Sequence, residues 1–496
     1  MRVLDLGIIA LFLIGMPLLG ALIGGRQRSA TDYFVSERRI SWWVVCVSVV
    51  SAETSTLTVL SVPTVAYGGT MTFLSLAVGY LLGRIVVSFV LLPRYVAGDL
   101  ITAYGFLGRR FGPDVQATAS VTFLITRLLA DGLRLFATAI PVKVVLAAYG
   151  VDVSYWVIVA VLGAAMVVYS FLGGVRAVVW VDAIQLLWYV LGAAVVIVVL
   201  SGLLPDGWFT AASDAGKFRV LDFAANPLTS PYAVVTALVG GAVLSMASHG
   251  ADQLVVQRLM ATRDVRSARR ALIGSGVVVF LQFALFLLIG VMLWAFYKGA
   301  PPVAGLGLHN NDELFAHFVV REMPTGLSGF VMAGILAAAL SSSLGAMASS
   351  TVADVYRRFA RRETTEQDVL RQGRIWTVVW AVLLVVCAGL FSSLTRRGDP
   401  IVEQGLSISG FTYGALLGSF LLGLLVRRAR RADALVAFVV TVAVMTFVIL
   451  GVDFGGKALA YPWYTSLGVV VTLVVGGLLS LRGTGDSRPS GRHDGP

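Results

Sequence analysis

The sequence contains few charged residues for its length. Only 13% of its 496 residues are charged and 57% are apolar, whereas an average soluble protein carries about 25% charged residues. A chain of this length would ordinarily fold as about three soluble domains, but its polar residues are too few to cover them. We therefore expect an integral membrane protein.

Cysteine is nearly absent. The two cysteines, Cys46 and Cys387, lie in apolar stretches, so there is no disulfide framework and no cysteine spacing typical of a metal site. A P-loop, an HExxH motif and a GxSxG motif are also missing. These absences give no support to ATP-driven transport, and we expect that the protein is not an enzyme.

Long apolar stretches are abundant instead. Segments of about 20 apolar residues, enough to cross a bilayer, recur along nearly the whole chain and predict about thirteen helices. The predicted spans run near Leu4–Gly24, Trp43–Tyr67, Met71–Leu92, Ala117–Ala148, Tyr155–Leu172, Ala177–Leu203, Tyr232–Val256, Ala271–Trp294, Gly326–Ser350, Ile375–Leu390, Leu406–Leu425, Ala434–Leu450 and Trp463–Leu481.

Lysine and arginine are divided unevenly among the connecting segments. The odd-numbered loops and the C-terminal tail hold about 26 of them, and the N-terminus and even-numbered loops hold about 8. Because positive residues stay in the cytoplasm, we predict a plasma-membrane protein with its N-terminus outside and its C-terminus inside. The net charge of +11 then needs no nucleic-acid partner. The richest loops contain Arg258, Arg263, Arg266, Arg269 and Arg270, followed by Arg357, Arg358, Arg361, Arg362, Arg371 and Arg374.

An acidic residue lies deep in the second predicted span. Glu53 occurs in SAETSTLTVLSVPTVAY among hydroxyl side chains and ahead of Pro63, and an ionised group at mid-bilayer costs at least about 2.5–3.5 kcal/mol. The pattern favours a helix broken at membrane depth, whose freed carbonyls can coordinate a cation. The alternative is an intact helix with back-bonded hydroxyls and a structural, hydrogen-bonded Glu53.

Other polar residues also lie in apolar spans. Three serines, Ser341 to Ser343, occur in the ninth span, where packing alone would need only small residues. Hydroxyl and carbonyl oxygens from two such helices could bind a small hard cation. Asp182 is either a helix-entry acid or a cation waypoint, and His249 is either a buried core residue or a ligand.

The fourth span carries Arg127, Asp131, Arg134 and Lys143. Asp131 lies four residues after the first arginine and three before the second, so one helix face can pair all three. This spacing predicts either a neutralised structural triad or a site in which the surplus guanidinium binds a substrate carboxylate.

Six segments occur in this order along the chain: DYFVSERRISWW, SAETS…VPTVAY, TAYGFLGRRFG, GGVRAVVWVDAIQ, ADQLVVQRLMA and AAALSSSLGAMASSTVADVY. On these segments the sequence resembles, from about Asp32 to Arg427, the sodium:solute symporter family. The resemblance implies an all-α, polytopic fold with two inverted five-helix repeats, like the leucine transporter. The repeats would cover residues 41–203 and 231–427, joined by an extracellular loop at 204–230. Residues 1–40 would add a helix and a cytoplasmic loop, 428–481 two helices, and 482–496 a disordered tail.

The same resemblance implies sodium as the coupling ion. Asp182 matches an acid on the path of sodium to the cytoplasm, and Glu53 stands where relatives often have Asp or Asn. Gly345 and Ala346 replace serines that bind an extra sodium in some relatives, which favours one sodium per cycle. The sodium ligands carried over are the carbonyls of Ser51, Thr54 and Ala339 and the side chains of Ser342 and Ser343.

The resemblance also implies a substrate pocket. Arg134 matches an arginine that can contact a carboxylate in relatives with carboxylated solutes. Of the positions that contact sugar in a sugar-carrying relative, only Thr58 keeps a hydroxyl, which favours a small polar solute, anionic in character, over a sugar. The implied pocket residues are Ser55, Thr58, Phe73, Arg134, Ser245 and His249.

These observations predict a sodium-coupled symporter that imports a small polar, carboxylate-bearing solute by alternating access, as a monomer or a loose homo-oligomer. Two alternatives keep the fold: coupling to protons through Glu53, and a sugar as the solute. A third alternative is a membrane sensor that binds a solute without transporting it.

Overall fold

The computed structural model shows an almost entirely helical protein. Among the residues that it describes there is no β-strand, and only two isolated bridges pair extended residues. The predicted disordered tail, apart from Arg482, and the arginines at 357, 358, 361 and 362 lie outside those residues. The structure describes residues 3–24, 40–96, 100, 102–148, 150–300, 302–308, 311–337, 343–356, 365–394, 401–452 and 458–482.

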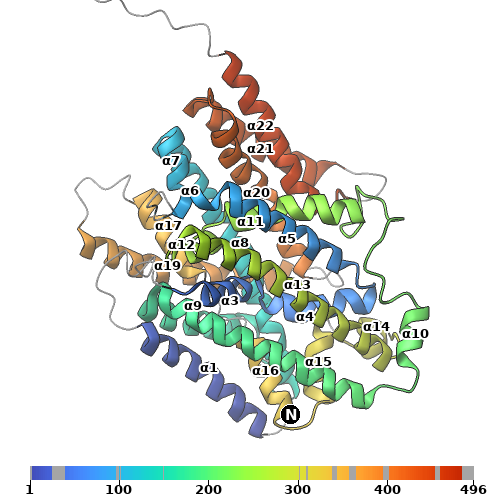
Figure 1. Ribbon diagram of the computed structural model, residues 1–496. Coiled ribbons are helices and arrows are strands. Elements are labelled where there is room, and N and C mark those ends of the chain that lie inside the picture. Colours follow the sequence, from blue (N-terminus) through green and yellow to red (C-terminus); the bar gives the residue numbers. More distant parts are fainter. Residues whose placement is uncertain are drawn as a thin grey trace, which may run out of the picture.

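Long apolar helices form most of the molecule (Figure 1). Within the described residues, eight helices are long and apolar enough to cross a membrane, or up to nine if one bent pair counts as a single span. Exposed side chains such as Val198 and Phe447, which are 72% and 68% accessible, suit contact with lipid rather than water. These eight helices are α1 (Val3–Gly24), α5 (Phe73–Val90), α9 (Tyr155–Leu203), α13 (Val265–Phe296), α19 (Glu366–Leu394), α20 (Ile401–Leu425), α21 (Arg431–Gly451) and α22 (Pro462–Arg482). Helix α8 (Pro113–Ala148) is also long but is not one of the eight.

Shorter helices connect or interrupt these spans. Several correspond to predicted spans that the structure divides, so the predicted number of about thirteen is only roughly supported. These helices are α3 (Trp42–Glu53), α4 (Thr56–Gly68), α6 (Leu92–Val96), α7 (Gly105–Phe111), α10 (Trp208–Asp214), the π-helix η2 (Thr236–Gly240), α11 (Gly241–Gly250), α12 (Gln253–Met260), α14 (Pro302–Leu306), α15 (Glu313–Arg321), α16 (Leu327–Ala337), α17 (Leu344–Ser350) and the π-helix η3 (Thr351–Tyr356).

The second predicted span is broken, as expected from its hydroxyls. Helices α3 and α4 meet at 63°, and the two residues between them, Thr54 and Ser55, are extended with ψ angles of 96° and 175°. Pro63 lies inside α4 rather than at the break. The alternative of an intact helix is therefore wrong.

The seventh predicted span is also interrupted, which the sequence did not predict. The structure divides it into η2, α11 and α12, with a two-residue break at Ala251 and Asp252. The carboxylate of Asp252 accepts a hydrogen bond from the Leu254 amide and so caps α12. Arg258, which the charge count placed in a loop, lies in α12 and is buried.

The fifth and sixth predicted spans lie in one element, α9, with no loop at residues 173–176. Its two parts have different neighbours. Near its start, the Trp156 ring lies against Gly389 of α19. Further along, the Trp188 ring lies 4.5 Å from the Phe12 ring of α1 and 4.5 Å from the Phe330 ring of α16.

Close helix packing surrounds the broken helix. A Cβ on Gly290 of α13 would come within 2.1 Å of the Pro63 carbonyl oxygen in α4. A Cβ on Gly83 of α5 would come within 2.2 Å of the Ala242 carbonyl oxygen in α11. Small residues allow backbones to approach this closely in membrane bundles. These contacts hold α4, α5, α11 and α13 around the break at Thr54 and Ser55.

Candidate functional site

The break between α3 and α4 leaves carbonyl oxygens without helical partners. The Thr54 amide and hydroxyl both donate to the Val50 carbonyl, at 2.8 and 2.7 Å. Within the part of the chain that the structure describes, no hydrogen bond to the Ser51 or Thr54 carbonyl is found. Because an unsatisfied carbonyl at membrane depth is costly unless it lines a cavity or binds a ligand, these two oxygens are suited to a cation.

Three other helices hold the break in place. The Ser51 and Tyr189 hydroxyls are 2.7 Å apart, and the Thr54 hydroxyl donates to Gln282 Oε1 at 2.9 Å. The Thr56 hydroxyl donates to the Ile335 carbonyl near the end of α16, at 3.3 Å. The end of α16 therefore reaches the first turn of α4, next to the break.

Only part of the predicted sodium site can be placed. Ser51, Thr54 and Ser343 are described, whereas Ala339 and Ser342 lie outside the described residues. The Ser343 side chain is buried, and its hydroxyl lies 3.8 Å from the Met347 sulfur.

Glu53 is ion-paired rather than solitary. Its carboxylate contacts the guanidinium of Arg84 in α5, which is fully buried, and lies 3.5 Å from Nε2 of His249 in α11. Arg84 also donates to the Ser275 hydroxyl at 2.7 Å. Arg84 was not among the predicted site residues, although an arginine within an apolar span indicates that it needs a partner.

The charges near the break balance. Asp252 contacts Arg127 and also accepts a hydrogen bond from the Tyr413 hydroxyl at 2.5 Å. Asp131 lies 3.4 Å from Arg127 and 3.7 Å from Arg134. Asp252 therefore balances the guanidinium that the spacing within the fourth span predicted to be in surplus. The full set is Arg84, Arg127 and Arg134 with Glu53, Asp131 and Asp252.

Arg134 is the arginine of this set with the weakest contacts. Its side chain is 30% exposed, and besides the ion pair with Asp131 it donates to the Ala52 carbonyl at 3.3 Å. The other two arginines are almost completely buried, each against a carboxylate. Of the three guanidinium groups, that of Arg134 is therefore best able to bind a ligand.

A small cavity lies beside the break. It has a volume of about 70 Å³, well below the roughly 300–1,000 Å³ of ligand pockets. Since one enclosed water needs about 10–15 Å³ in such a measure, the cavity has room for a few waters only. Its lining residues are Glu53, Ser55, Leu57, Thr58, Phe73, Tyr80, Ala130, Arg134, Phe283, Val402, Gly405, Leu406 and Ser409.

Four of the six predicted substrate residues, Ser55, Thr58, Phe73 and Arg134, line this cavity. The other two lie behind it. The Ser245 hydroxyl donates to the Tyr80 carbonyl at 2.8 Å, and the buried His249 has its Nδ1 2.8 Å from the Ser248 hydroxyl. The structure brings the first four together and separates them from Ser245 and His249.

Asp182 forms a buried ion pair on the predicted cytoplasmic side of the break. Arg258 of α12 donates to Asp182 Oδ2 at 2.8 Å, and the Ser48 hydroxyl donates to the same oxygen at 3.0 Å. Both charged side chains are almost completely buried. This cluster joins α3, α9 and α12 on the side of the break that the charge count places toward the cytoplasm.

The second helix break differs from the first because its carbonyls are satisfied. The Tyr95 hydroxyl donates to the Gly250 carbonyl at 2.5 Å, and the Tyr104 hydroxyl donates to the Ala251 carbonyl at 3.0 Å. Gln253 accepts the Ala103 amide at 2.8 Å. This break is therefore a poor candidate for a cation site.

Comparisons with known proteins find similar sequences along most of the chain. The sequence profile of the sodium:solute symporter family matches residues 33–441. The chain is 29% identical to the sodium/sialic acid symporter NanT of Aliivibrio fischeri, over 95% of this chain and 92% of that protein. It is 28% identical to the human sodium/iodide cotransporter, over 90% of this chain and 70% of that protein.

Solved structures share the fold. A substrate-bound, outward-open Na⁺-coupled sialic acid symporter superposes with a TM-score of 0.84 at 24% identity, over 97% of this chain and 98% of that one. The nucleobase-cation-symport-1 transporter MHP1, in a closed conformation with bromovinylhydantoin bound, superposes with a TM-score of 0.56 at 14% identity, covering 92% and 95%. The predicted all-helical, leucine-transporter-like fold is confirmed.

Proposed function

The chain belongs to the sodium:solute symporter family, and we propose that it imports a small, carboxylate-bearing organic solute together with one sodium ion per cycle. Membership makes it a multi-pass, sodium-coupled solute symporter and not an enzyme. Its relatives include transporters of sialic acid, monocarboxylates and iodide. Because these solutes differ, the solute of this chain must be argued from its own cavity.

Arg134 carries the argument for a carboxylate. It is the partly exposed guanidinium in the lining of the cavity, and guanidinium groups bind carboxylates through two parallel hydrogen bonds. The hydroxyls of Ser55 and Thr58 line the same space and can donate to further solute oxygens. A sugar would fit these hydroxyls but would make no use of the guanidinium, whose contact with Asp131 is 3.7 Å long.

Charge balance also supports the pairing of a carboxylate with a cation. The three arginines and three acids around the break sum to zero, so a lone sodium ion or a lone carboxylate would add an uncompensated charge at membrane depth. Binding the two together keeps the region neutral, which lowers the electrostatic penalty. This mutual dependence is the requirement of a coupled symporter.

The proposed sodium site joins the first break to the ninth predicted span. The free carbonyls of Ser51 and Thr54 would bind the ion, with Ala339, Ser342 and Ser343 completing its shell. The contact between Thr56 and Ile335 supports this arrangement, because it brings α16 to the break. Asp182 and Glu53 are proposed to guide the cation toward the cytoplasm.

Sodium binding would tie α3 and α4 to α16 and α17 and so stabilise the state that accepts solute from outside. Alternating access then follows from movement of one repeat against the other around this fixed site. In this proposal the N-terminus faces outside and the C-terminus faces the cytoplasm.

The test is uptake into sealed proteoliposomes. Sialic acid, lactate and a neutral hexose are offered with and without an inward sodium gradient. We expect accumulation of a carboxylate only with sodium, and a loss of apparent affinity of about 10- to 100-fold in Arg134→Gln, the range for a hydrogen bond to a charged group. The double variant Ser342→Ala/Ser343→Ala should lose sodium dependence, whereas Arg219→Gln, an exposed arginine remote from the cavity, should behave as wild type.

Two outcomes would contradict the proposal. Uptake that proceeds unchanged without sodium, and in the double serine variant, would remove the sodium site. Uptake that follows the pH gradient and disappears in Glu53→Gln would instead support proton coupling.

A further inference from the structure

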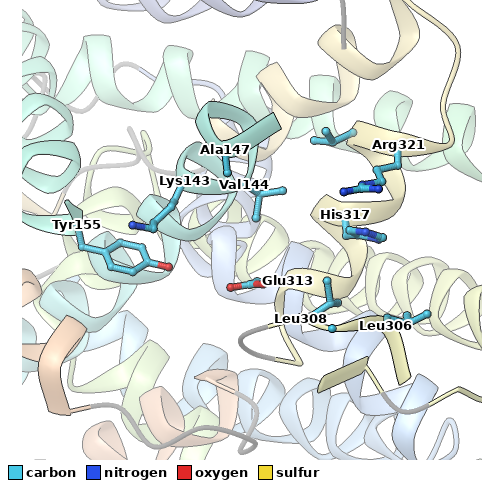
Figure 2. Close-up of a pocket in the computed structure, with 11 residues that line it drawn as sticks. Lys143, Val144, Ala147, Tyr155, Leu306, Leu308, Glu313, His317 and Arg321 are labelled. Carbon is cyan, nitrogen blue, oxygen red and sulfur yellow. The ribbon is translucent and has the colours of Figure 1, made fainter. Parts of the chain in front are cut away.

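A second, larger cavity lies away from the proposed transport site. It has a volume of about 270 Å³ and lies between the end of α8 and the α14–α15 segment, on the side predicted to face outside (Figure 2). One wall is formed by α8 and the start of α9, and the other by the end of α14 and by α15. Its lining residues are Lys143, Val144, Ala147, Tyr155, Leu306, Gly307, Leu308, Glu313, His317, Val320 and Arg321.

Opposite walls of this cavity carry cationic groups. Figure 2 shows Lys143 and Tyr155 on one side, His317 and Arg321 on the other, and Glu313 between them. At neutral pH the lining holds two cations, Lys143 and Arg321, and one anion, Glu313, so it is cationic by one charge. A monoanion would therefore neutralise the lining.

Both cations have capacity for a ligand. Arg321 is exposed and makes no hydrogen bond or ion pair with any residue in the described part of the chain. The Lys143 ammonium donates to the Val153 carbonyl at 3.1 Å and to Asp152 at 3.0 Å. The Asp152 side chain is 92% exposed, and such surface pairs contribute little.

The rest of the lining is apolar. Val144, Ala147, Leu306, Leu308 and Val320 contribute aliphatic groups, and the Tyr155 ring lies 5.1 Å from the Lys143 ammonium. The volume is close to the lower limit of ligand pockets, about 300 Å³. An apolar body with one acidic group therefore matches the cavity in size, polarity and charge.

We propose that this cavity is a regulatory binding site for a small organic monocarboxylate with an apolar body. The carboxylate would lie between Lys143 and Arg321. Such a ligand would bridge α8 and α15. Just before α15, Asp312 accepts a hydrogen bond from the Ile401 amide of α20 at 2.9 Å. The neighbouring Asn311 carbonyl accepts one from the Thr64 hydroxyl of α4 at 3.3 Å. These contacts connect α15 to the broken helix. A ligand that fixes α15 against α8 would therefore restrain α4.

Benzoate is the probe, and calorimetric titration of the detergent-solubilised full chain is the measurement. We expect binding to wild type and at least about tenfold weaker binding to Arg321→Gln and Lys143→Gln, as expected for removing a hydrogen bond to a charged group. Glu313→Gln should bind more tightly, because it removes the anion from the lining. Arg219→Gln, an exposed arginine outside the cavity, is the matched control.

A steric variant keeps the test independent of charge. Ala147→Phe places a ring in the cavity without altering any charge and should also abolish binding, with an unchanged Tm as the check on folding. Absence of benzoate binding to wild type, or equal binding to wild type and Arg321→Gln, would overturn the proposal. Binding that is lost in Arg134→Gln and retained in Arg321→Gln would overturn it too. Benzoate would then bind in the transport cavity, a result that supports the proposed function but not the second site.

Discussion

The buried pair of Glu53 and Arg84 illustrates how individual charges are retained in this membrane protein. Arg84 is fully buried, and its guanidinium contacts the carboxylate of Glu53 and the hydroxyl of Ser275. Breaking a buried pair by removing one partner leaves the other charge uncompensated, which destabilises a fold by about 3–5 kcal/mol. The same contact already engages the carboxylate of Glu53, which does not favour a role as proton carrier.

A double-mutant cycle tests this pair. We expect Glu53→Gln and Arg84→Met each to lower the free energy of unfolding by about 3–5 kcal/mol. The double variant should lose less than the sum of the two, because it leaves no unpaired charge. Unfolding in detergent measures all four proteins, and additive losses would show that the two side chains do not stabilise each other.

Asp312 provides a pH dependence outside the membrane spans. Burial raises the pKa of this carboxyl from 3.8 to about 6. The folded state then binds a proton that the unfolded chain releases between these values, so stability falls as the pH rises from about 4 to 6. The loss of folding stability is at most about 3 kcal/mol, since each unit of difference between the two pKa values corresponds to about 1.4 kcal/mol.

Asp312→Asn should remove this dependence while keeping an acceptor for the Ile401 amide. We expect the variant to gain stability relative to wild type at pH 7.5, and the gain to shrink as the pH falls through 6 toward 4.5. Thermal unfolding at a series of pH values measures the difference. A difference in Tm that is the same at every pH would show that Asp312 does not titrate in this range.

For individual residues, the sequence identified charged site residues more reliably than the side chains with which they form ion pairs. Glu53 and Arg134 stand out because charge is rare in apolar spans, and both line the cavity beside the break. Arg84 and Asp252 were missed because their partners are distant in sequence; Arg127 and Asp252 are 125 residues apart. Only the packing of helices brings such pairs together, and no local pattern encodes it.

Close backbone contact is the main feature at the scale of helices. The absence of a side chain at Gly290 lets α13 lie directly on the Pro63 carbonyl of α4. In Gly290→Ala the added Cβ would lie 2.1 Å from that oxygen, so the helices must separate. We expect a loss of stability of about 1–3 kcal/mol from overpacking and reduced uptake, measured by unfolding and by tracer accumulation.

Gly477 provides the matched control for this substitution. It lies inside α22, and a Cβ there meets nothing within 4 Å. Gly477→Ala should therefore be neutral or stabilising by about 0.5–1 kcal/mol, the usual effect of alanine inside a helix. Equal effects of the two substitutions would mean that the contact with Pro63 is unimportant.

The two broken helices show which interruptions sequence can predict. Hydroxyls and an acid at membrane depth indicated the break at Thr54 and Ser55. The break at Ala251 and Asp252 was less visible, because its signal is a single helix-capping aspartate after a glycine. The predicted spans Tyr155–Leu172 and Ala177–Leu203 implied a loop between them, yet α9 is helical throughout, since the glycines there permit a turn without requiring one.

The distribution of arginine makes a prediction about the whole molecule. Cys46 and Cys387 are both buried, so an impermeant thiol reagent should label the wild type weakly. With the N-terminus outside, Ser213→Cys in α10 should be labelled on intact cells. Arg266→Cys in α13 should be labelled only after the membrane is opened. Labelling of both variants, or of Arg266→Cys alone, on intact cells would contradict the predicted orientation.

The difference between the two helix breaks bears on the driving force for transport. Of the two breaks among the described residues, the first has free carbonyls and the second does not. In the proposed cycle one cation would accompany one carboxylate, so no net electric charge would cross the membrane. The membrane potential, which contributes about 2.3 kcal/mol per 100 mV to each moving charge, would then do no net work. A tenfold sodium gradient, equivalent to about 1.4 kcal/mol, would support about tenfold accumulation. Import would continue in a depolarised cell, and tracer would accumulate without a measurable current.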